Sequence, residues 1–427
     1  MKILLKQVTI SDANSEFNGT TQDILIENGK ITAIQPQLNI DADQIIHLPN
    51  AYVSQGWVDP FVHFCDPGFE YRETIESGAK AAASGGFTRV ATLPNTKPII
   101  QNKAQIEYIT NTSNQYATIV HALGAISKNI EGKELAEMYE MHHAGALAFT
   151  DGLMPLQSSA LMVKALQYIK AFNGIIIQIP EDTTITPHGL MNEGVVSTQM
   201  GLPGKPAVSE TLMIARDIHL VEYTGSAIHF TGITTAASIQ LIKEAKQKGL
   251  KVSCSVTPQH LWYCDEDLKN YDTNLKLTPP LRTKSDMLAL REGLLNGVID
   301  AITTHHTPVE VDKKVCEFEY AQPGMIGLQT AYSIINSIFK DTPEHIKTNW
   351  LGNNIRNIFN LPNAAIMPGN TAELTLYNNA ETFSFSLQNN KSKSANTPFL
   401  NKPFTGKVYG IINKDKVFLN ESSYHGS

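Results

Sequence analysis

Eight short runs of apolar and β-branched residues follow one another between residues 52 and 308, and this rhythm constrains the fold more than any other feature. Each run is almost continuously apolar, as expected of strands buried on both faces of a parallel sheet. The first run ends at His63, and the others lie at 87–93, 117–123, 145–150, 174–179, 226–231, 251–256 and 300–304. Between them, apolar residues recur at spacings of three and four, which indicates helices at 133–143, 161–172, 209–223 and 236–248.

Strands that alternate with helices eight times predict an α/β protein whose residues 51–360 form a (β/α)8 TIM barrel. A doubly wound open sheet is the alternative, but no Gly-x-Gly-x-x-Gly follows the first strand. Strand patterns also occupy both ends of the chain, residues 1–50 and 361–427, with a hairpin signal at Asn28-Gly29. Neither end could bury a core alone, so we expect them to pair into one small composite β-sandwich.

Composition narrows the class of protein. The 427 residues carry a formal net charge of −7, which argues against nucleic acid as the main partner. No apolar run reaches membrane-spanning length, and the first residues lack the apolar core of a signal peptide. The four cysteines form no Cys-x-x-Cys pair, so we read them as reduced thiols. We therefore expect a cytoplasmic protein that binds neither nucleic acid nor membranes.

The strand that ends at His63 carries a broken metal-binding pattern. A strand ending in Asp-x-His-x-His places two imidazoles on one side, because side chains alternate along an extended chain. Two such imidazoles could bind one zinc ion. Here the segment reads Asp59-Pro60-Phe61-Val62-His63, and Phe61 has no lone pair to donate. The pattern predicts a metallohydrolase scaffold that lacks part of its metal site.

An ordered set of short motifs, from about Gly29 to about Val417, resembles the dihydroorotase family. The motifs are Asp66-Pro67-Gly68, residues 81–88 and 93–98, Met191-Asn192-Glu193-Gly194, Pro279-Pro280-Leu281-Arg282, residues 322–327 and Asn396-Thr397-Pro398-Phe399. The resemblance implies a metal-dependent amidohydrolase barrel with a composite β-sandwich. It also implies interconversion of carbamoyl aspartate and dihydroorotate in pyrimidine synthesis.

The differences from the family pattern fall on the positions that carry its chemistry. Phe61 replaces a metal ligand, and Cys65 replaces the arginine that clamps the substrate carboxylate. After the fifth and sixth strands, Gln178-Ile179-Pro180-Glu181-Asp182 and Gly232 stand where the family has metal-binding histidines. After the eighth strand, His305 occupies the position of the catalytic Asp, and Val309 that of a substrate-holding His.

A few positions of the family site survive. The resemblance leaves Asp59, His63 and Asp151 at metal-site positions and Asn95 at a substrate-contacting one. His63 and Asp151 are therefore residual metal ligands, and His305 could be a third because it projects from the end of a strand. An imidazole bound to a metal cannot also serve as the base, however.

Cys65 has two interpretations. It and His63 face the same side of an extended segment, so the thiol could be an activated nucleophile. The favoured interpretation is a small residue that fills the space left by an arginine.

Three functions follow. The first is a dihydroorotase-like pseudoenzyme without a resident cofactor, structural or regulatory, which we expect to form homo-oligomers. Non-catalytic members of the family act as structural partners of aspartate transcarbamoylase, so that enzyme is the candidate partner. The second is an active dihydroorotase or related cyclic amidohydrolase with zinc in a rebuilt site. The third is a small-molecule binding protein that uses the barrel mouth.

Overall fold

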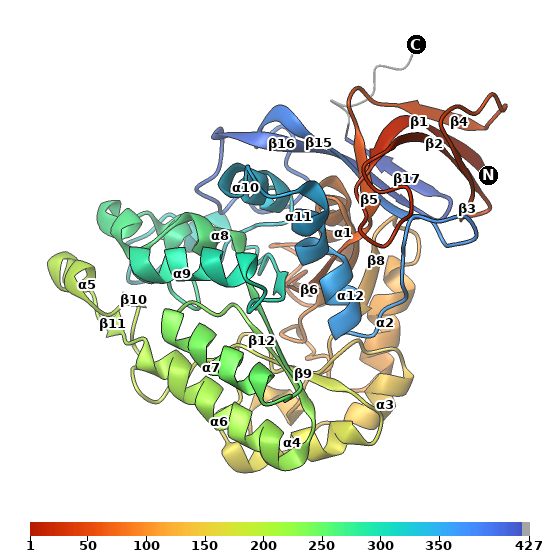
Figure 1. Ribbon diagram of the computed structural model, residues 1–427. Coiled ribbons are helices and arrows are strands. Elements are labelled where there is room, and N and C mark those ends of the chain that lie inside the picture. The colour runs from red at the N-terminus through yellow and green to blue at the C-terminus, as the bar shows by residue number, and fades with distance from the viewer. Residues whose placement is uncertain (421–427) are drawn as a thin grey trace.

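A closed barrel of short parallel strands lies at the centre of the computed structural model, which describes residues 1–420 (Figure 1). Seven of its positions are strands: β6 (Trp57–Val62), β7 (Phe87–Thr92), β8 (Ile119–Ala122), β9 (Ile175–Gln178), β12 (Ala227–Thr231), β13 (Val252–Val256) and β14 (Ala301–Ile302). The fourth position is held by Phe149, which forms parallel bridges to Gly124 and Ile176. All eight runs singled out in the sequence thus contribute to the barrel.

The barrel closes between its first and last strands. The main-chain N–H of His63 donates to the carbonyl of His306 at 2.8 Å. Nearby, the N–H of Thr304 donates to Oδ2 of Asp59, also at 2.8 Å. The predicted barrel is confirmed, and the competing open sheet is excluded by this closure.

Helices surround the barrel in an outer layer (Figure 1). They are α1 (Ile75–Ser84), α2 (Lys103–Ser113), α3 (Met138–His143), α4 (Ser159–Lys170), α6 (Val208–Thr224), α7 (Ala236–Gln247), α8 (Pro258–Trp262), α9 (Lys284–Leu295), α10 (Ala331–Ile338), α11 (Glu344–Leu351) and α12 (Asn353–Ile358). The helix expected at 133–143 is shorter than predicted, because Leu135 pairs with Ser127 in an antiparallel bridge. Among residues 1–420 no helix has the length and apolarity needed to cross a membrane.

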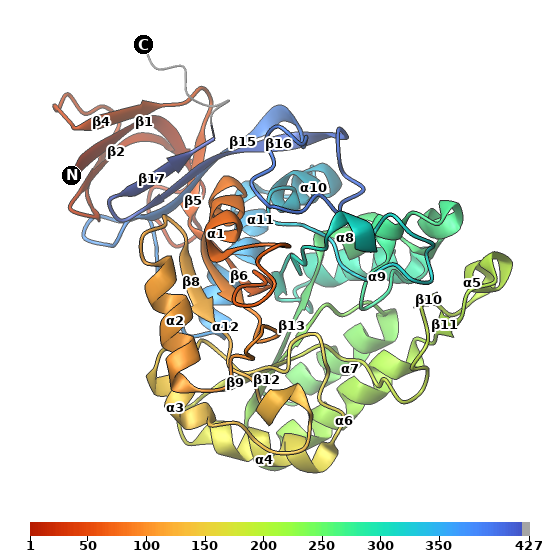
Figure 2. The same ribbon diagram turned by 180° about the vertical axis from the view of Figure 1, so that it is seen from behind.

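One eight-stranded sheet unites the two ends of the chain beside the barrel (Figure 2). Its strands are β1 (Lys2–Ile10), β2 (Thr21–Glu27), β3 (Lys30–Gln35), β4 (Gln44–His47), β5 (Tyr52–Gln55), β15 (Glu373–Ser384), β16 (Pro403–Asn413) and β17 (Lys416–Leu419). Asn28 and Gly29 form the predicted hairpin turn, both with positive φ (51° and 74°). The composite sheet is as predicted, although β5, assigned to the barrel from sequence, pairs with β1 and β15.

A buried ionic triad joins this sheet to the barrel. The carboxylate of Glu373, on β15, forms ion pairs with two guanidinium groups: that of Arg89, on β7, at 2.5 Å, and that of Arg356, on α12, at 2.8 Å. Burial alone would raise the pKa of Glu373, but the two guanidinium groups outweigh it and lower that pKa to about 2. The three side chains therefore fix three elements that lie far apart in the sequence.

A small arm projects from the barrel body between β9 and α6 (Figure 1). It consists of the parallel pair β10 (Met191–Asn192) and β11 (Gly204–Lys205) with the short helix α5 (Val195–Met200) between them. The side chain of Lys205 returns to the barrel, where its Nζ donates to Glu181 at 2.5 Å. The arm thus contributes a buried cation to the edge of the barrel mouth.

Candidate functional site at the barrel mouth

Residues that follow the first, second and fourth barrel strands meet at the mouth. Nε2 of His63 lies 3.1 Å from the carbonyl oxygen of Asn95. The Asn95 amide donates to the carbonyl of Asp151 at 3.2 Å, and its Oδ1 accepts from the N–H of Leu153 at 3.1 Å. Asn95 therefore links His63 to the Asp151 segment, and its own amide is fully engaged in doing so.

His63 and Cys65 form a neutral pair. Sγ of Cys65 lies 3.1 Å from Nδ1 of His63. Because Nε2 donates to the Asn95 carbonyl, Nδ1 has the lone pair that accepts from the thiol. Burial lowers the pKa of His63 to about 4 and raises the pKa of Cys65 well above that of a free thiol. A buried, protonated thiol is a poor nucleophile, which favours the space-filling interpretation of Cys65.

The carboxylate of Asp151 is turned toward the loop that follows β8. Its Oδ1 accepts from the main-chain N–H groups of Ile126 and Ser127, both at 2.9 Å. Its Oδ2 accepts from the hydroxyl of Ser127 at 2.5 Å. Burial nevertheless raises the pKa of Asp151 to about 6. These bonds give the side chain a complete structural role.

Phe61 and His305 fill the centre of the mouth together. Their ring centroids are 4.6 Å apart with planes 35° apart, and Nε2 of His305 lies 2.7 Å from Oγ1 of Thr231. A Cβ placed on Gly232 would lie 2.5 Å from Cε1 of His305. The His305 imidazole therefore occupies the space that a side chain at position 232 would need. We call Phe61 and His305 the plug.

The remaining predicted positions are structural. Asp59 accepts from the N–H of Phe61 at 3.1 Å in addition to that of Thr304, and burial raises its pKa to about 6. The Gln178 amide exchanges hydrogen bonds with the main chain of Leu156 at 3.3 and 3.4 Å. Neither side chain offers a free donor or acceptor pair to a ligand.

His306 has different neighbours from His305, whose φ of 47° takes the chain out of the extended conformation. Its Nε2 lies 3.4 Å from Oε2 of Glu73, and its Nδ1 accepts from the N–H of Gly327 at 3.2 Å. The Glu73 carboxylate also accepts hydrogen bonds from the hydroxyls of Ser77 and Ser392. Sequence reasoning missed this buried carboxylate, because an isolated Glu before a helix gives no signal that it will be buried.

Zinc does not fit the donor set that is present. A hydrolytic zinc site needs three protein ligands and an open position for water. Within residues 1–420, no group of three His, Cys, Asp or Glu side chains could hold a metal ion. His63 and Asp151 are engaged by neighbouring groups, and His305 contacts the hydroxyl of Thr231 and the ring of Phe61. The structure thus does not assemble the three residual ligands suggested by the sequence.

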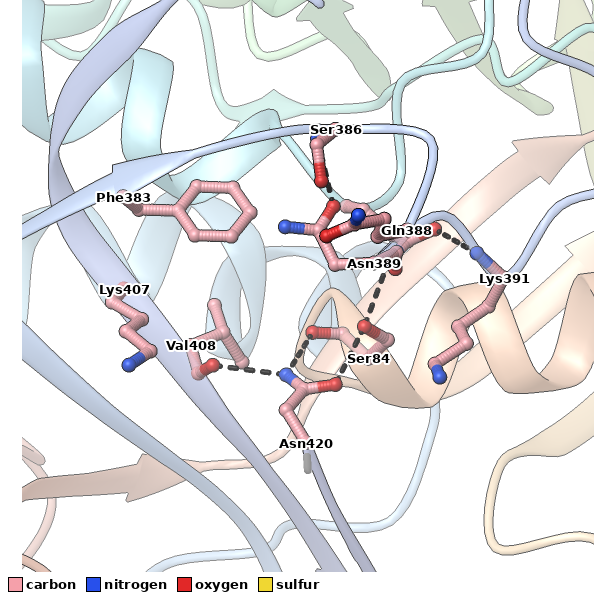
Figure 3. Close-up of a pocket in the computed structure, with 10 residues that line it drawn as sticks. Ser84, Phe383, Ser386, Gln388, Asn389, Lys391, Lys407, Val408 and Asn420 are labelled. Atoms are coloured by element: carbon pink, nitrogen blue, oxygen red, sulfur yellow. Dashed lines mark hydrogen bonds between the residues drawn. The ribbon is translucent and has the colours of Figure 1, made fainter. Parts of the chain in front are cut away.

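A separate hollow of about 260 Å³ lies away from the mouth, between the end of α1, the strands β15 and β16 and the loop between those strands (Figure 3). The Asn420 amide donates to the carbonyls of Ser84 and Val408 at 3.1 and 2.9 Å, and its Oδ1 accepts from the Ser84 hydroxyl at 2.7 Å (Figure 3). None of the residues predicted for the site lines this hollow, and its polar groups largely satisfy one another.

Comparisons with known proteins agree with this architecture. A family model described as "Dihydro-orotase-like" matches residues 52–238. The chain is 38% identical to a dihydroorotase of Syntrophus aciditrophicus, over 99% of this chain and 100% of the relative. It is 39% identical to a dihydroorotase of Acetivibrio thermocellus, over 98% and 99% of the two chains. Among solved structures, L-hydantoinase (dihydropyrimidinase) from Arthrobacter aurescens superposes with a TM-score of 0.86 at 21% identity, covering 98% of this chain and 96% of that one.

Proposed function

This chain belongs to the dihydroorotase family. We propose that it is a dihydroorotase-like pseudoenzyme, because other residues stand at most of the catalytic positions that the resemblance identifies in the sequence. The observation that carries the proposal is the plug. The rings of Phe61 and His305 lie against each other, tilted by 35°, where the family pattern places a metal ligand and the general base. The His305 ring leaves no room for a side chain at position 232.

Three separate requirements of the reaction are unmet. Activation of water needs a metal that lowers the pKa of the bound water to about 7, and the ligand set is incomplete. Proton transfer needs a carboxylate where His305 stands, and burial lowers the pKa of that imidazole to about 3. Recognition of the substrate carboxylate needs the bidentate arginine that Cys65 replaces. Losses within one cooperative site are not independent, so no single surviving group compensates for them.

A second candidate is an active dihydroorotase or related cyclic amidohydrolase, and the comparisons favour it over the pseudoenzyme. Both relatives described above are named dihydroorotases, and they match nearly the full chain at 38% and 39% identity. Such activity would require the plug to move and a ligand set to form that differs from the family pattern.

The role of the pseudoenzyme is part of the same proposal. The barrel and its composite sheet are intact, while the substitutions are concentrated at the mouth, as expected of a chain that acts through its surface. We therefore propose a structural or regulatory subunit that forms homo-oligomers, with aspartate transcarbamoylase as the candidate partner. Purified chain mixed with that enzyme should elute from a sizing column as one larger complex, and separate elution at micromolar concentrations would contradict the pairing.

Turnover by the purified full chain tests the proposal against the second candidate. The absorbance of dihydroorotate should not fall faster with the chain and added zinc than with zinc alone. Elemental analysis of chain purified without chelators should find less than one zinc per chain. Robust turnover that scales with protein concentration would overturn the pseudoenzyme and establish the second candidate.

A further inference from the structure

A chain of hydrogen bonds runs through the inside of the barrel and ends at the plug. Its members lie opposite each other on two neighbouring parallel strands, with His229 beside Ser253 and Thr231 beside Ser255. Side chains two residues apart on a strand point to the same face. The apolar residues that alternate with these four belong to the core beneath the helices, so the four polar side chains face the barrel interior.

The contacts of this chain follow one another without a gap. Nδ1 of His229 lies 2.9 Å from Oγ of Ser253, and its Nε2 lies 3.0 Å from Oγ of Ser255. Oγ of Ser255 donates to Oγ1 of Thr231 at 3.1 Å. Oγ1 of Thr231 in turn lies 2.7 Å from Nε2 of His305. The chain therefore leads from Ser253, which is half-buried near the start of β13, to an imidazole at the mouth.

The direction of one bond fixes the directions of those before it. A serine hydroxyl has one proton, and Ser255 donates it to Thr231. The bond between Ser255 and His229 must then take its proton from Nε2 of the imidazole. Burial lowers the pKa of His229 to about 3, so near neutral pH the ring carries a single proton. Nδ1 of His229 consequently accepts from the hydroxyl of Ser253.

The last bond, between Thr231 and His305, has two possible donors, and its length favours the hydroxyl. Bonds that hydroxyls donate to oxygen centre on about 2.7–2.8 Å, whereas N–H···O bonds centre on about 2.9–3.0 Å. The distance here is 2.7 Å. The neighbouring hydroxyl of Thr303 is a poorer acceptor for the Thr231 proton, because it lies 3.3 Å away. Thr231 therefore donates to Nε2 of His305, which leaves the proton of that ring on Nδ1.

Nδ1 is the side of the His305 ring that faces the mouth. The residue is 8% exposed. Its Nδ1 is bonded to no group within residues 1–420, yet it is not among the side-chain atoms that are buried without a partner. We propose that the oriented chain makes position 305 an N–H donor at the mouth, where the family pattern places a carboxylate. A ligand that reaches the plug must then bring an acceptor, such as a carbonyl or carboxylate oxygen.

Thr231 and Ser255 are positioning residues in this proposal, since they act only through His305. The proposal holds whether or not the chain hydrolyses anything, because the place of a proton on a ring is measured without substrate or turnover. It also makes a sharp demand on the molecule. The two imidazoles at the ends of one hydrogen-bond chain must carry their protons on different nitrogens, Nε2 in His229 and Nδ1 in His305.

Nitrogen NMR of the full chain, with nitrogen-15 in the histidine rings, tests this demand. Protonated and unprotonated ring nitrogens differ widely in chemical shift, and couplings to the ring C–H protons distinguish Nδ1 from Nε2. The two signals of interest are assigned by their loss in His229→Gln and His305→Gln. A neutron crystal structure of the wild type locates the same protons if either variant fails to fold. The opposite tautomer at either ring would overturn the proposal.

Two valine variants test the cause. Thr231→Val keeps the shape of the side chain but removes the donor to His305, so the shifts of the two His305 nitrogens should converge as both tautomers become accessible. Thr303→Val is the matched control, because the Thr303 hydroxyl lies 3.3 Å from that of Thr231 and 3.2 Å from that of Ser255, and no bond joins it to His305 in the described structure. The His305 signals should stay as in the wild type there. Unchanged signals in a folded Thr231→Val chain, or equal convergence in both variants, would refute the role of Thr231.

Discussion

At the scale of single residues, the side chains that positions 232 and 305 can carry depend on each other sterically. Position 232 has φ +68°, and a Cβ there would meet the His305 ring. The absence of a side chain at position 232 therefore leaves room for the imidazole of His305. A side chain at position 232 therefore requires a different residue, or a different ring position, at 305.

The coupling predicts the cost of Gly232→Ala. The variant should lose about 1–3 kcal/mol of unfolding free energy beyond the strain of a positive φ, because a packed ring must move. Gly249→Ala is the matched control, since Gly249 has φ +74° and open space around a Cβ. Urea unfolding measures both. In a His305→Ala background the excess cost should vanish, and an excess that persists there would refute the steric coupling.

Phe61→His tests whether one restored ligand suffices. The variant with added zinc should show no dihydroorotate turnover above the zinc blank, because the other ligands, the base and the clamp are still missing. The measurement is the loss of dihydroorotate absorbance, with the wild type as control. Rescue by this single substitution would mean that the remaining substitutions are tolerated.

Much of this site could be located from sequence, but its interactions could not. Period-two and period-3.6 patterns report burial, so they placed Asp59, His63 and His305 at strand ends. The direction of the Asp151 carboxylate depends on two N–H groups of a loop some 25 residues earlier, which no local pattern encodes. The helix expected at 133–143 began late for a similar reason, since the bridge from Leu135 to Ser127 outweighs local helix preference.

At the scale of secondary-structure elements, the triad of Glu373, Arg89 and Arg356 holds β15, β7 and α12 together. Glu373→Gln should cost about 3–5 kcal/mol of unfolding free energy, because it leaves two guanidinium groups buried without their counterion. Glu381→Gln on the same strand is the control. Glu381 pairs with Lys407 but is 37% exposed, so its loss should cost no more than about 1 kcal/mol. Equal losses in the two variants would contradict a special role for the triad.

The lowered pKa of Glu373 also predicts that the free energy of unfolding depends on pH in acid. The folded pKa of Glu373 is about 2, below the roughly 4.3 of an unfolded Glu. A depressed carboxyl pKa stabilises the fold above the unfolded value, and this contribution is lost as the pH falls toward 2. Unfolding free energy measured from pH 4.5 to 2 should therefore fall more steeply in the wild type than in Glu373→Gln.

At the scale of the whole molecule, buried histidines dominate the response to mild acid. Burial lowers the folded pKa of five imidazoles to about 3 or 4, those of His63, His121, His229, His260 and His305. Burial raises three carboxyl pKa values to about 6 or 7, those of Asp59, Asp151 and Asp217. Between about pH 4 and 6.5, the unfolded chain binds a proton on most of these five histidines, whereas the folded chain binds a proton on most of the three aspartates instead. The unfolded chain therefore binds more protons than the folded chain does.

Stability should consequently rise with pH across that window. Urea unfolding at half-unit pH steps measures the slope, and His47→Gln should leave it unchanged, because that side chain is already exposed. A flat profile, or stability that falls between pH 4 and 6.5, would mean that the aspartates outweigh the histidines.

The composite sheet can be completed only late in synthesis, because strands from the two ends of the chain pair in it. β5 pairs with β15, yet roughly 320 residues separate them, which a ribosome takes about 15 to 60 s to add. Throughout that interval the leading strands have an open edge of the kind that recruits other chains. A nascent chain must therefore shield this edge, through a chaperone or by local compaction, before its own tail emerges to cover it.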